Sequence, residues 1–476
     1  MAAPQPIPIS ELGESFYDAV APAGFPACKP RFLNRRWAQR IGLAGLSDQD
    51  WVRHFCRFEP LPGNLPQPLA LRYHGHQFRV YNPDIGDGRG FLFAQLRDGQ
   101  GRLLDLGTKG SGQTPYSRSG DGRLTLKGGV REVLATEMLE ALGVNTSKSF
   151  ALFETGEALW RGDEPSPTRS SVLTRLSHGH IRIGNFQRLA FFDNAEGIAS
   201  LARYCLEHLL DEPMGDDREN AARLLDRVCS ATATLAASYV AAGFVHGVLN
   251  SDNINITGES FDYGPWRFAP EWDEDFTAAY FDETGLYAFG RQPEAIHWDV
   301  AQLAGCLAMI GEAAVLSDQL ASWPRRFEQA LVDRVLARLG VGTRGETHDR
   351  SLVSAALMAL RSRIVGIDRF YFDWRGGRIP TGEIYRAGAF DEFRAKLEGR
   401  QRGLAHCYWE DEAPCSMLIE EVEAIWSAIA DHDDWAPFEA KIEAIRRLGE
   451  AMQGSDGAQR QRKNGRGDAM PPDAAA

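Results

Sequence analysis

Residues 246–264 carry the side chains best suited to chemistry. Two strand-forming stretches in this segment are separated by a Thr-Gly turn, so we expect a hairpin in which Ile254 pairs with Phe261. That pairing would place Asn253 opposite Asp262, with their β-carbons roughly 5 Å apart. An amide oxygen and a carboxylate at that separation suit Mg²⁺, which takes few protein ligands and completes its shell with water or phosphate oxygens. The alternative is a polar hairpin end that binds nothing.

The same segment resembles the protein-kinase signature, which reads His-Arg-Asp, four residues, Asn, then a strand and Asp-Phe-Gly. His246 takes the place of the histidine, Asn253 that of the metal-binding asparagine, and Asp262-Tyr-Gly that of the final triplet. Val248 occupies the position of the catalytic aspartate, and valine cannot accept a proton. This is a pseudokinase pattern, with the metal ligands kept and the base lost. Asp252 is the nearest carboxylate that could replace that base.

A glycine-rich turn followed by two strands lies much earlier in the chain. Gly86-Asp-Gly-Arg-Gly90 leads into a predicted strand at 91–96, and a second strand at 102–109 ends in Lys109. Glycines let the backbone approach phosphate groups closely, although such loops are also common as plain turns. A kinase places its phosphate-binding lysine on a strand shortly after its glycine loop. The combination therefore indicates a nucleotide site.

The next predicted element is a helix at 130–142, where apolar residues recur at helical spacing. In a kinase the corresponding helix carries the glutamate that pairs with the phosphate-binding lysine. Glu132, Glu137 and Glu140 are all candidates, and the helical periodicity does not choose between them.

Arg175 and Arg182 lie at and beyond the end of another predicted strand, 171–176. The guanidinium fork suits phosphate oxygens, so two arginines near Lys109 could neutralise a triphosphate. A solvated basic turn is the alternative. The loop at 110–123 is too rich in glycine for regular structure and too long for a plain connection, which is typical of functional loops.

Composition is that of a globular protein. The 476 residues are 43% apolar and 25% charged, and a net charge of −13 argues against a nucleic-acid partner. Seven cysteines without a Cys-x-x-Cys pair predict reduced thiols rather than disulfides or a zinc site. The chain shows neither an apolar signal core nor a membrane-spanning run, so we expect a cytoplasmic protein.

The motifs divide the chain into four expected parts. These are an N-terminal arm at 1–65, a nucleotide-clamping N-lobe at 66–190, a helical C-lobe with the catalytic and metal loops at 191–452, and a disordered polar tail at 453–476.

Taken together, the motifs resemble the selenoprotein O family over residues 70–305. The resemblance rests on Gly86–Gly90, Gly107–Arg118, Gly120–Arg123, Asn250–Asn253 and Phe261–Pro265. Members of that family are pseudokinase-fold protein adenylyltransferases that bind ATP in a flipped orientation. The γ-phosphate is buried and the α-phosphate is presented for transfer of AMP.

The resemblance implies a role for each candidate residue. Nucleotide contacts fall on Gly86, Gly88, Arg89, Asp121 and Gly122, and the phosphate clamp on Lys109, Arg175 and Arg182. Glu132 becomes the partner of the lysine, Asp252 the proton acceptor, and Asn253 and Asp262 the metal ligands, with Glu132 and Asp262 completing the nucleotide site. Many members carry a redox-linked cysteine or selenocysteine near the C-terminus. The last cysteine here is Cys415, so that switch is not expected.

We therefore expect an α+β protein with a two-lobed protein-kinase-like fold and an extended, mainly helical C-terminal lobe. It would transfer AMP from ATP, with Mg²⁺ or Mn²⁺, to Ser, Thr or Tyr hydroxyls of proteins and release pyrophosphate. The alternatives are a kinase that uses Asp252 as a displaced base and an ATP-binding scaffold without catalysis. The expected partners are ATP and acceptor proteins, with neither nucleic acid nor membrane.

Overall fold

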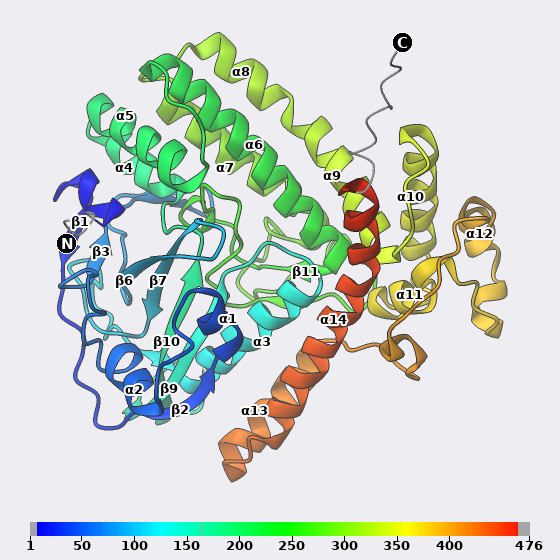
Figure 1. Cartoon of the computed structure of the whole chain (residues 1–476), viewed down its shortest axis with the longest axis horizontal. Coiled ribbons are helices and arrows are strands. Elements are labelled where there is room, and N and C mark those ends of the chain that lie inside the picture. Colours follow the sequence, from blue (N-terminus) through cyan, green and yellow to red (C-terminus); the bar gives the residue numbers. More distant parts are fainter. Residues whose placement is uncertain (1–6, 163, 465–476) are drawn as a thin grey trace, which may run out of the picture.

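The computed structural model describes residues 7–162 and 164–464 as an antiparallel sheet with helices packed against it and beyond it (Figure 1). This arrangement confirms the predicted α+β class. The large sheet has the strand order β1-β3-β6-β7-β10-β9-β2, and β8 pairs with β10 outside this row. Its strands are β1 (Tyr17–Ala19), β2 (Lys29–Leu33), β3 (Leu69–Leu71), β6 (Leu92–Arg97), β7 (Leu103–Lys109), β8 (Leu124–Thr125), β9 (Lys148–Leu159) and β10 (Thr168–Ser177).

The two strands predicted after the glycine turn form as β6 and β7. All residues of β7 are buried, because helices and loops cover both faces of the sheet at its centre. Lys109 therefore ends a strand that has no solvent-exposed face. Two smaller antiparallel pairs complete the β-structure, β4 (Gly75–Gln77) with β5 (Val80–Asn82), and β11 (Phe244–Val245) with β12 (Arg267–Phe268).

Helix α3 (Leu126–Ala141) packs against β9 and β10. It begins earlier than the predicted 130–142 because the Thr125 side chain accepts a hydrogen bond from the Gly128 N–H and caps the first turn. Two short helices, α1 (Arg35–Arg40) and α2 (Asp48–Phe55), lie beside the N-terminal strands.

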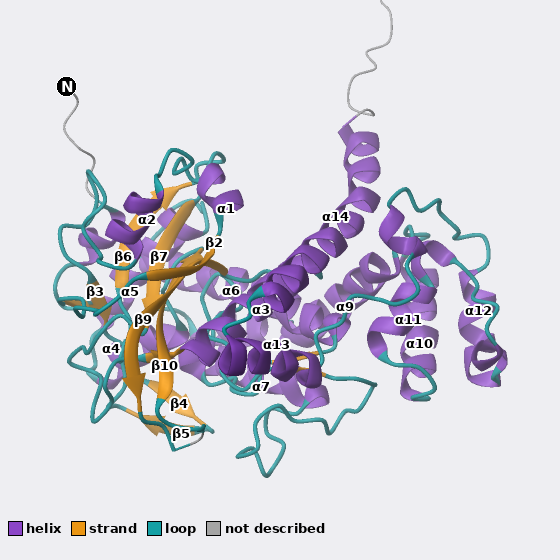
Figure 2. Cartoon of the chain, turned by 90° about the horizontal axis from the view of Figure 1, so that it is seen from below, coloured by secondary structure: helices purple, strands orange, loops and turns teal. Residues whose placement is uncertain are grey.

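The rest of the chain is mainly helical. The helices are α4 (Ile183–Phe191), α5 (Ala195–Tyr204), α6 (Asp217–Ala242), α7 (Gln292–Leu307), α8 (Ala313–Ala321), α9 (Trp323–Leu339), α10 (Glu346–Arg361), α11 (Ile367–Asp373), α12 (Asp391–Leu397), α13 (Ile419–His432) and α14 (Ala436–Asn464). Helices α10 to α12 lie at the end of the molecule opposite the sheet (Figure 2). Helices α13 and α14 return to contact α3.

The last helix overlaps the tail predicted at 453–476. Helix α14 continues to Asn464, so residues 453–464 of the predicted tail belong to this helix. Gln, Arg and Lys are good helix formers and extend a helix already anchored by packing. The remainder of the predicted tail, 465–476, lies outside the described residues. No helix in the described ranges combines the length and apolar character needed to span a membrane.

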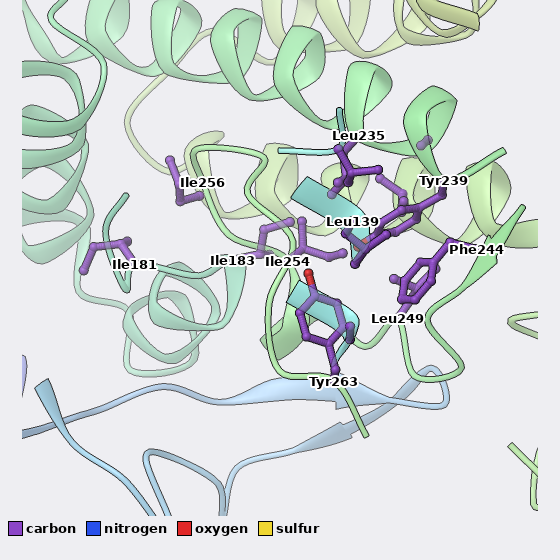
Figure 3. Close-up of a cluster of buried hydrophobic side chains, with 14 of the residues drawn as sticks. Leu139, Ile181, Ile183, Leu235, Tyr239, Phe244, Leu249, Ile254, Ile256 and Tyr263 are labelled. Carbon is purple, nitrogen blue, oxygen red and sulfur yellow. The ribbon is translucent and has the colours of Figure 1, made fainter. Parts of the chain in front are cut away.

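The segment with the candidate metal ligands does not form the predicted hairpin. Residues 254–256 instead bond to residues 181–183, with N···O distances of 3.0 Å for both hydrogen bonds. Ser260 bonds to residues 145–147, at 2.8 Å for both. The two arms separate because their apolar side chains are buried against different neighbours, including Ile181 and Ile183 on one side (Figure 3). The argument that placed Asn253 opposite Asp262 is therefore wrong.

The cysteine prediction is also wrong at one point. Cys28 and Cys56 form a disulfide, with their α-carbons 6.1 Å apart, and the other five cysteines are free. Cys56 follows α2 and Cys28 precedes β2, so the bond ties the N-terminal segment to the edge of the sheet. Sequence spacing could not reveal this pair, because the two residues approach only through the packing of α2.

We expect the disulfide to stabilise the protein. Closing a loop of 28 residues restricts the unfolded chain, which corresponds to about 3 to 4 kcal/mol of unfolding free energy. Titration of the denatured, unreduced protein with a thiol reagent should count five thiols. The Cys28→Ser/Cys56→Ser double variant should unfold at lower denaturant concentration. A count of seven thiols would contradict the assignment.

Candidate functional site

A cavity of about 720 Å³ opens between the glycine turn, the 110–123 loop, β10 and the 252–262 segment. Seven basic side chains line it, namely Arg89, Lys109, Arg118, Arg123, Arg161, Arg175 and Arg182. Four carboxylates line it as well, namely Asp87, Asp121, Asp252 and Asp262. An excess of cations in a protein with a net charge of −13 marks this cavity as a site for an anionic ligand.

The buried end of the cavity is built around Lys109. Its ammonium group pairs with Glu132 of α3 and lies 2.6 Å from Oδ1 of Asp262. Arg175 of β10 approaches the same oxygen at 3.3 Å. Of the three candidate glutamates, the structure places Glu132 on the lysine, while Glu137 pairs with Arg446 of α14.

Asp262 is the only carboxylate in this cluster that both contacts the cations and lines the cavity. Burial acts to raise its pKa, but Lys109, Arg175 and Arg89 outweigh that effect and hold the pKa well below its usual range. Its backbone lies in the left-handed region, with φ of +61°. Such strain in a non-glycine residue is characteristic of functional sites.

Arg182 closes the inner wall. It donates to Asp87 at 3.2 Å, to the Tyr73 hydroxyl at 3.2 Å and to the Asp252 carbonyl at 3.1 Å. Its guanidinium also lies over the Tyr73 and Phe261 rings, at 4.4 and 4.9 Å from their centroids. These contacts fix one cation firmly in the wall of the cavity.

Asp252 lies in a 3₁₀ turn, Ser251–Asn253, and lines the cavity with only 7% of its surface exposed. Burial, with a smaller contribution from the nearby Asp262 carboxylate, raises its pKa to about 6 against the opposing effects of Arg182 and Gln77. Its Oδ1 atom has no hydrogen-bond partner within the described residues. A buried carboxylate with an unused acceptor is suited to take a proton.

Asn253 follows directly but is not among the residues lining the cavity. Its side-chain N–H donates to the Val248 carbonyl at 3.1 Å, which orients the amide and leaves its oxygen for another partner. Within the described residues, no group of three or more His, Cys, Asp or Glu side chains is arranged to hold a metal. A metal here would depend on few protein ligands and on the bound substrate.

Gly86 and Gly88 line the cavity, but tight packing between loops also requires them. A β-carbon on Gly86 would approach the Tyr116 ring to 2.5 Å, and one on Gly88 would approach the Tyr116 carbonyl to 2.9 Å. The glycine turn and the 110–123 loop therefore form one wall. Arg89 projects from this wall and is exposed.

Asp121 and Gly122 lie at the outer end of the cavity. Gly122 has φ of +68° and packs against the backbone of Gly112. The Asp121 carboxylate is already paired with Arg161, at 2.9 and 3.0 Å. Arg161 belongs to the tip between β9 and β10, which joins the site from a part of the chain with no recognised motif.

Sequence reasoning missed several lining residues. Asp87 lies inside the glycine motif and could have been named with its neighbours. Tyr73 precedes β4 and Gln77 is the last residue of β4, and no pattern in the sequence distinguished either of them. Trp160 carried no signal beyond being an aromatic residue at the end of a strand.

Comparisons with known proteins identify the family of this chain. The model of the family described as "Protein adenylyltransferase SelO" matches residues 5–381. A protein from Gloeobacter violaceus named protein nucleotidyltransferase YdiU is 43% identical over 461 residues, covering 92% of this chain and 94% of the relative. A protein of the same name from Synechocystis is 40% identical over 468 residues, covering 92% and 96%. The resemblance seen in the motifs is thus confirmed, and the chain belongs to the SelO family of protein adenylyltransferases.

Proposed function

We propose that this protein transfers AMP from ATP to Ser, Thr or Tyr hydroxyls of acceptor proteins and releases pyrophosphate. The observation that carries the proposal is one cavity with two chemical ends. Lys109, Arg175 and Arg182 form a buried cationic end. The Asp252 carboxylate, whose Oδ1 atom has no hydrogen-bond partner within the described residues, lines the same cavity. Family membership supports nucleotidyl transfer as the reaction.

The buried cations favour a triphosphate held by its terminal phosphate. All three residues are at most 5% exposed, so they can contact only a group that enters the cavity fully. In a site with little water their attraction for phosphate is strong. Holding the terminal phosphate there leaves the α-phosphorus nearer to the mouth, where an acceptor hydroxyl can reach it.

Asp252 would then act as the proton acceptor. The acceptor oxygen forms a bond to the α-phosphorus, its proton passes to the Asp252 carboxylate, and the bond to pyrophosphate breaks. Val248, at the position where a kinase has its base, contributes only its carbonyl, as the acceptor of the Asn253 amide. Phosphorylation by the usual route therefore lacks its base, while adenylyl transfer has one.

A divalent cation fits this arrangement. Lys109 and Arg175 contact the same oxygen of Asp262, so we assign the other oxygen, with the amide oxygen of Asn253, to Mg²⁺ or Mn²⁺. When bound, such an ion would neutralise charge that develops on the leaving pyrophosphate. The chain's own part is to hold the two oxygens in place, through the strained Asp262 backbone and the bond from Asn253 to Val248.

We further propose that the sheet region and the helical region correspond to the two lobes of a kinase-like fold, with the cavity between them. Residues 66–190 would form the N-lobe and residues 191–452 the C-lobe. The cytoplasmic location stays a prediction. The Cys28–Cys56 disulfide argues against it, because disulfides persist mainly in oxidising compartments.

Three variants should separate metal binding from proton transfer. Asn253→Ala and Asp262→Ala should lose the Mg²⁺-dependent part of ATP binding, because each removes a ligand. Asp252→Asn should keep most ATP binding and lose transfer by about 10²- to 10⁴-fold, since the base acts on the acceptor. Calorimetric titration with Mg²⁺ and ATP measures the first property and AMP incorporation the second.

Asp84→Asn is the matched control, since Asp84 is exposed and does not line the cavity. Its binding and transfer should equal those of the unmodified protein. Loss of ATP binding in Asp252→Asn as severe as in Asp262→Ala would mean that Asp252 is a metal ligand and not the base.

The reaction type can be read from labelled ATP. Incubation with ATP labelled on the α-phosphate should place label on protein, with a gain of one AMP mass on a Ser, Thr or Tyr. ATP labelled on the γ-phosphate should place none, and Asp252→Asn should give none with either. Label from the γ-phosphate alone would establish a kinase. Label from neither, despite ATP binding, would establish a nucleotide-binding scaffold.

A further inference from the structure

Trp160 is a large aromatic residue that is exposed instead of packed in the core. Its residue is 74% exposed, yet it lines the cavity that holds the buried cations. It follows the last residue of β9, at the tip that leads into β10. An exposed tryptophan at the mouth of a ligand cavity offers a flat surface for a ring.

The two ends of the cavity differ in chemistry. Arg175 and Lys109 lie at the buried end, whereas the outer end consists of Trp160 and the exposed residues 118–121. Leu159 pairs with Thr168 across β9 and β10, and Arg175 is seven residues further along β10. Seven residues of strand span roughly 23 Å along the backbone. The side chains of Trp160 and Arg175 extend from these two positions into the cavity. A ligand that meets both ends has a charged end and a flat end.

The tip that carries Trp160 is held in place. Arg161 forms a two-point ion pair with Asp121, at 2.9 and 3.0 Å, and its N–H donates to the Ser166 hydroxyl at 2.8 Å. A second ion pair joins the 110–123 loop, which also carries Asp121, to β9. Arg123 contacts both carboxylate oxygens of Glu157 at 3.0 Å. The backbone that carries Trp160 is thus tied to the loop that forms the rest of the outer wall.

We propose that Trp160 stacks on the base of the bound nucleotide, and that the Asp121–Arg161 pair is the positioning contact that holds the ring there. This rests on the proposed function in one respect, that the triphosphate occupies the cationic end. With the phosphates at Lys109 and Arg175, the base must point outward, toward the Trp160 ring. Stacking accepts any base, so the contact contributes affinity for nucleotides without choosing among them.

The test compares ligands with and without a base. Trp160→Ala should raise the Kd for ATP about tenfold and that for GTP by a similar factor, while the Kd for tripolyphosphate changes by less than about twofold. Trp160→Phe should recover most of the ATP affinity. Asp121→Asn should show a smaller loss with the same selectivity for ligands that carry a base. Titration calorimetry in the presence of Mg²⁺ supplies all of these constants.

Phe192→Ala is the matched control, because Phe192 is an aromatic residue with 58% exposure that does not line the cavity. It should leave every Kd unchanged. An unchanged ATP affinity in Trp160→Ala, or an equal loss for ATP and tripolyphosphate, would overturn the proposal. Absence of AMP transfer by the unmodified protein would refute the proposed function but not the stacking, which is measured by binding alone.

Discussion

The ammonium group of Lys109 is buried, and a buried charge is tolerated only when it is paired. Its two partners come from different parts of the chain, Glu132 from α3 and Asp262 from the segment after α6. This one requirement brings a strand, a helix and a loop to the same point. Removing any member would leave an uncompensated charge in the interior, so the geometry of the cavity depends on this cluster.

The same cluster also prepares the protein for an anionic ligand. Lys109 and Arg175 share one oxygen of Asp262, and Arg182 is bonded to Asp87 and to the Asp252 carbonyl. The cations are therefore held in position before a ligand arrives, and little reorganisation is needed when phosphate enters. Asp252 differs from its neighbours, because burial raises its pKa to about 6 and its Oδ1 atom has no hydrogen-bond partner within the described residues.

The sequence was informative wherever a local pattern determines structure. Strand-forming composition and the turn between them predicted β6 and β7, and helical spacing predicted α3, although not which of its glutamates would pair with Lys109. The hairpin at 254–261 failed because its isoleucines are buried against residues 181–183, a long-range contact that no local pattern encodes. The Cys28–Cys56 bond and the placement of Trp160 depend on tertiary packing in the same way.

The orientation of the nucleotide is the central claim, and a crystal structure with Mg²⁺ and an ATP analogue that resists cleavage between the α- and β-phosphates tests it most directly. The account predicts the terminal phosphate within hydrogen-bond distance of Lys109 and Arg175, and the base beside Trp160. A base buried against Lys109, with the terminal phosphate at the mouth of the cavity, would contradict it.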